Sequence, residues 1–174
     1  VFDLTASGLL AAAEALRNGR DAAGNPLTGT PDLFLGATAN PGAKNFEAEV
    51  ENTRRKIDAG AKMLQTQAIY HVDQLKRFID AVKPDGAAVL AGIIPLKSEK
   101  SGPWLNANLP GVVVPPDMLA AMDEAAREGK TRERGIDLAA GVVRDMKSLC
   151  AGVHIMAIGW EAEVPAILAK AGVR

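Results

Sequence analysis

Apolar residues along this chain alternate between helical spacing and short continuous runs. From Leu9 to Leu16 they recur at helical spacing, and Thr5 or Ser7 stands where a helix cap belongs. Residues 19–31 are rich in Gly, Asn and Pro, which predicts a loop. Residues 32–38 then form a short apolar run of the kind found in buried parallel strands.

The same alternation continues to the end of the chain. Further strands are predicted over residues 62–67, 87–94 and 153–158, and further helices over 45–59, 72–82, 115–127, 131–149 and 161–171. His71 precedes one of these helices and is a candidate cap. Four strands, each separated from the next by helices, indicate parallel pairing with right-handed crossovers.

Two α/β architectures fit this order: a doubly wound sheet and half of a (βα)8 barrel. No G-x-G-x-x-G motif follows a predicted strand, which counts against a dinucleotide-binding sheet. A complete barrel needs about 250 residues, so a chain of 174 residues matches about half of one. The chain also opens on the apolar residues Val1 and Phe2 rather than on a polar, flexible segment. We therefore expect one partial barrel domain over residues 1–174, belonging to a longer protein or completed by oligomerisation.

Composition narrows the function classes. The formal net charge is -1 and aromatic residues make up 4%, so neither nucleic acid nor an anionic membrane surface is an expected partner. No apolar run has the length of a membrane span. The single cysteine, Cys150, excludes an internal disulfide and favours a reducing, cytoplasmic location.

Candidate chemistry lies where strands end, because barrel enzymes place their sites at the carboxyl ends of their strands. Gln67 ends the second strand, and its amide can both donate and accept toward a heterocycle, or be satisfied by backbone. Lys56, near a helix C-terminus, is either a solvated cation or an anchor for a phosphate or ribityl chain. His154, inside an apolar strand, is more typical of a core residue than of a ligand. Two histidines and one cysteine without clustered carboxylates predict no metal site.

Three segments resemble the methylenetetrahydrofolate reductases. Residues 56–67, Lys-Ile-Asp-Ala-Gly-Ala-Lys-Met-Leu-Gln-Thr-Gln, follow the family's K-x-x-A-G-A pattern with a later T-Q. Residues 91–96, Ala-Gly-Ile-Ile-Pro-Leu, are similar to its next strand, and residues 152–158 are similar to its G-x-H strand. The order and spacing of these segments cover nearly the whole chain.

The resemblance implies the last four βα units of a (βα)8 barrel that holds FAD, within a reductase of roughly 300 residues. It also implies reduction of 5,10-methylenetetrahydrofolate to 5-methyltetrahydrofolate in one-carbon metabolism. Gln67 would contact the folate, while Lys56 and Glu49 would help to hold FAD. The family's acidic catalytic residues lie on earlier strands, so no catalytic residue is expected in this chain.

The sequence departs from the family pattern at three of the implied site positions. Asn40 stands where a tyrosine often lies beside the flavin, and Met156 and Trp160 stand where many members have a folate-binding tyrosine and arginine. The ending Gly152–Glu161 is similar to a branch from acetogenic and related bacteria. That similarity leaves two electron donors open, NAD(P)H or a partner redox protein.

Two other functions stay open from the residues alone. An aldolase-like or lyase-like barrel would need a Schiff-base lysine at a strand end, and Lys97 lies near one. A half-barrel without catalysis would act as a binding or assembly module. Bound flavin would give a visible spectrum, whereas these two alternatives would be colourless.

Overall fold

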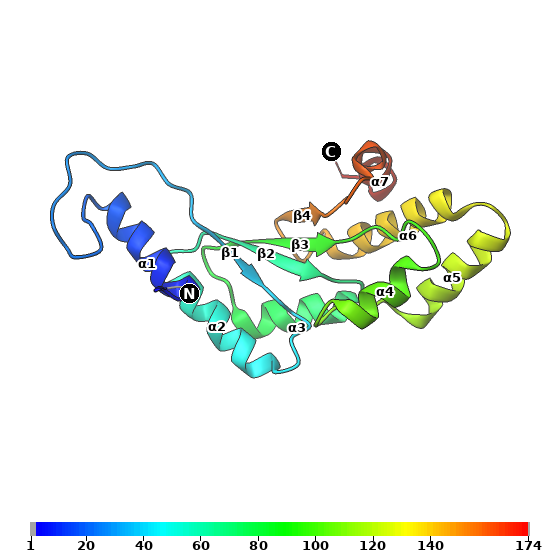
Figure 1. Ribbon diagram of the computed structural model, residues 1–174, viewed down its shortest axis with the longest axis horizontal. Coiled ribbons are helices and arrows are strands. Elements are labelled where there is room, and N and C mark those ends of the chain that lie inside the picture. The colour runs from blue at the N-terminus through cyan, green and yellow to red at the C-terminus, as the bar shows by residue number, and fades with distance from the viewer. Residues whose placement is uncertain (1–2, 174) are drawn as a thin grey trace.

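The computed structural model describes residues 3–173, which form one four-stranded parallel sheet with the strands in chain order (Figure 1). The strands are β1 Gly36–Ala39, β2 Met63–Ala68, β3 Ala88–Ile93 and β4 Gly152–Ile155. Each strand pairs in parallel with its neighbour in sequence. The predicted α/β class and parallel pairing are confirmed.

Helices occupy the connections between the strands. They are α1 Ala6–Arg17, α2 Phe46–Asp58, α3 Val72–Val82, α4 Ser101–Asn108, α5 Pro116–Arg127, α6 Thr131–Met146 and α7 Val164–Ala171, with a short 3-10 turn, η1, at Glu161–Glu163. Helices α2, α3 and α6 lie along one side of the sheet (Figure 1). The opposite side carries no helix over β1 and β2 in that view.

The two faces of the sheet differ as the alternation of strand side chains requires. On β2, Leu64, Thr66 and Ala68 are buried, whereas Gln65 and Gln67 on the other face are only partly buried. The buried face joins the main core, whose largest members include residues of β2, β3, α3 and α6. We call the face that carries Gln65 and Gln67 the open face.

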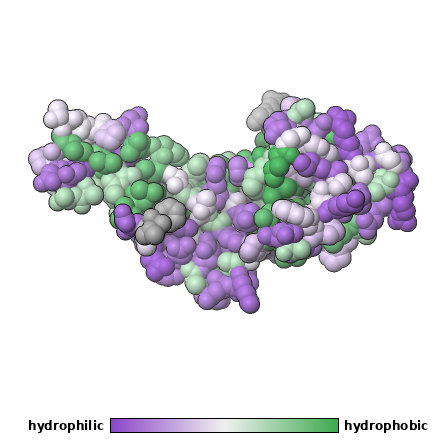
Figure 2. Space-filling model, in the orientation of Figure 1, coloured by the Kyte–Doolittle hydropathy of each residue, from purple (hydrophilic) through white to green (hydrophobic). Residues whose placement is uncertain are grey.

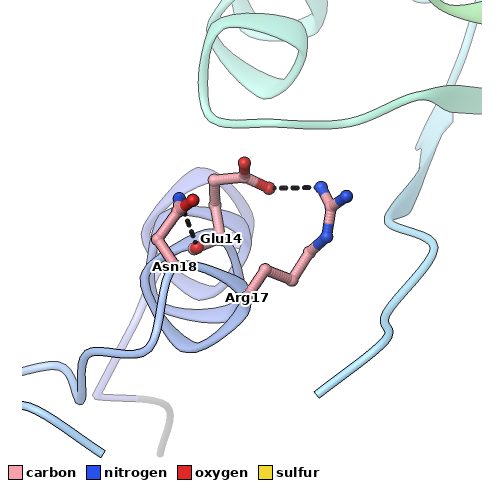
Figure 3. Close-up of polar contacts among 3 residues, drawn as sticks. All are labelled: Glu14, Arg17 and Asn18. Carbon is pink, nitrogen blue, oxygen red and sulfur yellow. Dashed lines mark hydrogen bonds and ion pairs between the residues drawn. The ribbon is translucent and has the colours of Figure 1, made fainter. Parts of the chain in front are cut away.

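Helix α1 packs against the C-terminal end of α2. Thr5, one of the two predicted caps, is the N-cap of α1: its side-chain oxygen accepts from the backbone N–H of Gly8. Glu14 accepts from Arg17 at 2.8 Å through its carboxylate and from the Asn18 amide at 2.9 Å through its carbonyl oxygen (Figure 3). The same Glu14 side chain lies over Gly60, just beyond α2, where φ is +109°. The sequence places Gly60 after this helix, and the left-handed conformation explains why glycine is needed.

Several predicted boundaries were wrong by a few residues. The first strand begins at Gly36 rather than at residue 32, because its ladder with β2 begins where Gly36 pairs with Met63. The last strand ends at Ile155 rather than at 158, and Ile158 itself has φ of +49°, which is incompatible with a strand. Helix α6 ends at Met146, three residues earlier than predicted.

Two helical features were missed or merged in the prediction. Helix α4 contains Gly102 and Pro103. These residues argue against a helix in the sequence, but they are tolerated in the first turn of one. The predicted helix over residues 161–171 is divided into η1 and α7, and Pro165 lies at the start of α7. His71 precedes α3 but makes no side-chain capping bond, so its predicted capping role was wrong.

Candidate functional site

A pocket of about 450 Å³ opens on the open face at the carboxyl ends of the strands. Figure 2 shows the molecular surface dipping between the end that carries α1 and the end that carries α7. Five of the six predicted site residues line the pocket, from β1 and its loop, α2, β2 and the end of β4: Asn40, Glu49, Lys56, Gln67 and Met156. The pocket therefore brings together residues that lie more than a hundred positions apart in sequence.

Lys56 reaches the pocket from α2 instead of pointing into solvent. Its side chain is only 6% exposed, and its Nζ donates to the carbonyl oxygen of Thr38 at 2.8 Å. The interpretation of Lys56 as a solvated surface cation was therefore wrong. An ammonium group carries three donors, so two remain for another partner.

Glu49 lies two turns before Lys56 on the same helix. Its Oε1 accepts from the backbone N–H of Asn40 at 2.9 Å, which fixes the carboxylate beside the end of β1. Lys56 and Glu49 thus contact neighbouring backbone groups at the outer edge of β1. One helix face presents a cation and a carboxylate to the same wall of the pocket.

Gln67 lies at an irregularity in the sheet. The register between β2 and β3 shifts between Gln65 and Ala68, and Gln67 Oε1 accepts from the backbone N–H of Ala68 at 3.0 Å. At the same place Thr66 Oγ1 accepts from the Gly92 N–H at 2.8 Å and donates to the Gln67 carbonyl oxygen. The Gln67 oxygen already accepts from one backbone N–H, which orients the amide, and its NH₂ group can donate to a ligand.

Asn40 lines the pocket and also joins two loops. Its Nδ2 donates to the Pro110 carbonyl oxygen at 3.1 Å, and its Oδ1 accepts from the Gly42 N–H at 3.2 Å. The side chain therefore ties the loop after β1 to the loop after α4. A Cβ atom at Gly42 would lie 1.8 Å from the Gly111 carbonyl oxygen, so only glycine allows this approach.

The pocket also contains residues that were not predicted to belong to a site, among them His154, which was interpreted as a core residue. Thr38, Gln65 and His154 line it, and all three lie on the open face. The alternation of side chains along each strand was the signal that would have found them. Trp160, by contrast, lies outside the pocket, with its ring against Gly135 of α6.

A second, more apolar hollow of about 370 Å³ adjoins the ends of β3 and β4. It is lined by Ile94, Pro95, Lys97, Trp104 and Ile158, together with residues at the start of α4. Lys97 Nζ donates to the Ile158 carbonyl oxygen. That contact draws the lysine across the strand ends.

The sequence profile described as methylenetetrahydrofolate reductase matches residues 7–172. The chain belongs to the methylenetetrahydrofolate reductase family. Similarity to individual members is distant.

Two curated relatives illustrate the distance. The 5,10-methylenetetrahydrofolate reductase of Escherichia coli strain K12 is 30% identical over 108 residues, 60% of this chain and 36% of that protein. Methylenetetrahydrofolate reductase (NADH) 1 of Zea mays is 26% identical over 158 residues, 86% of this chain and 26% of that protein. The chain thus spans about a third or less of the length of these reductases.

Among solved structures, one is described as an uncharacterized protein from Clostridium thermocellum that binds two copies of 5-methyl-5,6,7,8-tetrahydrofolic acid. It is 20% identical, with a TM-score of 0.49, and the match covers 81% of this chain and 53% of that one.

Within residues 3–173, no helix is both long and apolar enough to cross a membrane.

Proposed function

We propose that this chain supplies the last four βα units of a (βα)8 barrel that reduces 5,10-methylenetetrahydrofolate to 5-methyltetrahydrofolate with FAD. The observation that carries the proposal is the pocket at the strand ends that is lined by Glu49, Lys56 and Gln67. Family membership supports the reaction class. The four strands support the barrel, because the strands of a (βα)8 barrel also pair in parallel in the order of the chain.

The residues of the pocket fit part of FAD. A buried lysine with two free donors suits a phosphate or a ribityl hydroxyl, and the Glu49 carboxylate can accept from such a hydroxyl. FAD, when bound, would supply the hydride-transfer chemistry. Lys56 and Glu49 would hold and orient its chain along the outer wall of the pocket.

Gln67 would orient the folate on the other wall. Its NH₂ group can donate to an acceptor on the pterin while its oxygen stays on the Ala68 N–H. Positioning of this kind lowers the barrier by aligning the reacting atoms before the chemical step. The acid that protonates the folate would come from the earlier strands of the barrel. The electron donor would be NAD(P)H or a partner redox protein.

Two variants at Gln67 test the proposal in the full-length protein. Gln67→Glu keeps an oxygen for the Ala68 N–H but replaces the NH₂ donors with a charged carboxylate, whereas Gln67→Ala removes both contacts. We expect each variant to weaken folate binding by about 1–3 kcal/mol and so to lower folate turnover. The flavin absorbance of the purified protein should be unchanged.

Three results would count against this function. A colourless wild-type protein that takes up no added FAD would favour a binding module or a flavin-free barrel. Loss of flavin in Gln67→Glu would move Gln67 to the cofactor side. Unchanged turnover in both variants would remove it from the site.

A further inference from the structure

The chain passes through a strained backbone conformation just after β4. Ile158 has φ of +49° and Gly159 has φ of +84°. Left-handed backbone is unfavourable for a β-branched residue, which stays there only when its surroundings impose it. Side-chain packing does not impose it here, because Ile158 is 62% exposed. Among residues 3–173, and apart from its chain neighbours, no atom lies within 4 Å of a Cβ atom added at Gly159. The turn is held by polar contacts instead.

A single peptide group makes these contacts. Lys97 Nζ donates to the Ile158 carbonyl oxygen. The N–H of Gly159, which belongs to the same peptide group, donates to Glu161 Oε1 at 3.0 Å. The N–H donors of Gly159 and of Glu161 itself, together with the charge of Lys97, lower the pKa of this carboxyl, which is therefore ionised at neutral pH. A cation thus lies at the negative end of the peptide dipole and an anion at its positive end. We call Lys97 and Glu161 the clamp.

The chain on either side of the clamped peptide is fixed. The Met156 N–H donates to the Ile93 carbonyl oxygen at 2.9 Å, which continues the pairing of β3 with β4. The Trp160 ring packs against Gly135 of α6, where an added Cβ atom would lie 3.1 Å from the ring. Any rearrangement of this segment is therefore confined to residues 157–159.

The turn decides where the Ile158 side chain lies. Every second side chain of a strand points to the same face, and His154 and Met156 both line the pocket at the strand ends. Extended backbone would place Ile158 next in that row, at the mouth of the pocket. The left-handed turn instead places Ile158 in the wall of the second hollow, which also contains Trp104.

We propose that residues 157–159 form a gate for the pocket at the strand ends, which the clamp holds open and which Ile158 closes when the clamp is released. Contacts between exposed charged groups contribute little to stability, and both contacts of the clamp are exposed. The strain at Ile158 opposes them, so the open and closed arrangements are close in free energy. The gate controls entry to the pocket to which we assign FAD and folate, and in this respect it rests on the proposed function.

A double substitution in the full-length, FAD-loaded protein tests the gate, with binding of 5-methyltetrahydrofolate measured by calorimetry. Lys97→Met removes the ammonium group and keeps the aliphatic stem. We expect it to weaken binding about tenfold, because the apparent dissociation constant rises as the open fraction falls. Ile158→Gly added to Lys97→Met should restore binding to within about twofold of wild type, since glycine adopts the turn without strain and has no side chain to close the pocket.

The matched control is Lys100→Met, because Lys100 lines the same hollow as Lys97 but is not part of the clamp. We expect this variant to bind like wild type. Weakened binding in Lys97→Met without recovery in the double variant would show that Lys97 contacts the ligand itself, and would overturn the gate. Equal affinities of Lys97→Met and wild type would overturn it as well.

A second measurement follows Ile158 directly and needs no ligand. In protein with ¹³C-labelled isoleucine methyl groups, nuclear Overhauser contacts should join the Ile158 methyls to the Trp104 indole in wild type and to Met156 in Lys97→Met. Contacts with Trp104 alone in both proteins would overturn the gate. Wild-type protein that binds neither FAD nor 5-methyltetrahydrofolate would overturn the proposed function, and the position of Ile158 in Lys97→Met would still decide the gate.

Discussion

Lys56 is buried beside the Thr38 carbonyl oxygen, and this position makes its charge testable. Lys56→Met keeps the aliphatic stem and removes the ammonium group. Thr38 is exposed, so water can replace the lost donor and the fold should survive. If the ammonium also contacts FAD, its loss costs about 1.5–3 kcal/mol, or one to two decades in the dissociation constant. Titration of FAD into the apo-protein measures this.

The control for Lys56 lies on the same helix. Arg55 is exposed, and Arg55→Met removes a cation of the same sign one residue away. We expect it to leave FAD binding unchanged. Equal dissociation constants for Lys56→Met and wild type would show that Lys56 serves only the edge of β1.

Tyr70 joins the ends of two strands and gives the protein an alkaline limit. Its hydroxyl donates to the Ile94 carbonyl oxygen at 2.6 Å, and burial raises the pKa of this phenol. The unfolded chain releases the proton near the ordinary pKa of about 10, while the folded chain retains it. Unfolding therefore becomes easier as the pH rises above that value.

Tyr70→Phe separates this effect from that of other groups, since the chain has one tyrosine. At pH 7 the variant should lose about 1–3 kcal/mol of unfolding free energy, because the Ile94 carbonyl loses its partner. Between pH 9 and about pH 11, urea titrations should show a steeper loss of stability for wild type than for Tyr70→Phe. Parallel curves would mean that Tyr70 ionises equally in both states.

Residue identity predicted the members of the pocket better than their contacts. Lys56 and Gln67 could be named from their places in the sequence, and Glu49 from the family resemblance. A lysine near a helix end, however, looks the same in sequence whether it is solvated or buried. The edge position of β1 decides that question, since it leaves a carbonyl oxygen within reach of α2. The direction of the Gln67 amide likewise depends on a register shift between β2 and β3, which no residue pattern predicts.

At the scale of elements, two loops contact each other at a pair of glycine residues. The loop after β1 and the loop after α4 touch at Gly42 and Gly111, and Asn40 bonds across them. Gly111 has φ of +86°, and a Cβ atom there would lie 2.5 Å from Asn40 Oδ1. Gly111→Ala should cost about 1–2 kcal/mol for the left-handed conformation and a further 1–3 kcal/mol or so for overpacking.

The variant Gly129→Ala separates the conformational cost from the overpacking cost. It has φ of +71° with no atom within 4 Å of an added Cβ, so Gly129→Ala meets only the conformational cost. Urea denaturation of both variants should place Gly111→Ala clearly below Gly129→Ala in unfolding free energy. Equal losses would show that the two loops part easily and do not hold each other in place.

The order and type of most elements could be predicted, and the exceptions have local causes. Apolar runs and helical spacing located the four strands and the long helices, because each buries one face. The boundaries of β1 and β4 depended on where a ladder partner exists, which sequence alone does not record. Helix α4 was missed because Gly102 and Pro103 lower helix propensity, although its Leu105 is buried in the core.

At the scale of the whole molecule, the outer edge of β1 is only partly covered. Lys56 and Glu49 contact backbone groups at its carboxyl end. Its other end borders a groove of about 480 Å³ between α1 and β1. In Figure 2 apolar side chains gather over α1 and the chain that leads to β1. Leu9 and Phe34 line this groove and are 62% and 74% exposed.

An unpaired strand edge beside exposed apolar side chains favours association. In a closed barrel the strand before α1 would cover this groove, so the 174-residue chain expressed alone should self-associate at micromolar concentration. Leu9→Lys combined with Phe34→Lys should shift its sedimentation toward the monomer, because two charges oppose burial of the groove. Val113→Lys, at an exposed apolar residue in the loop after α4, provides the control and should leave the distribution unchanged. A wild-type chain that sediments as a stable monomer, or equal behaviour of both lysine variants, would mean that the edge of β1 needs no partner.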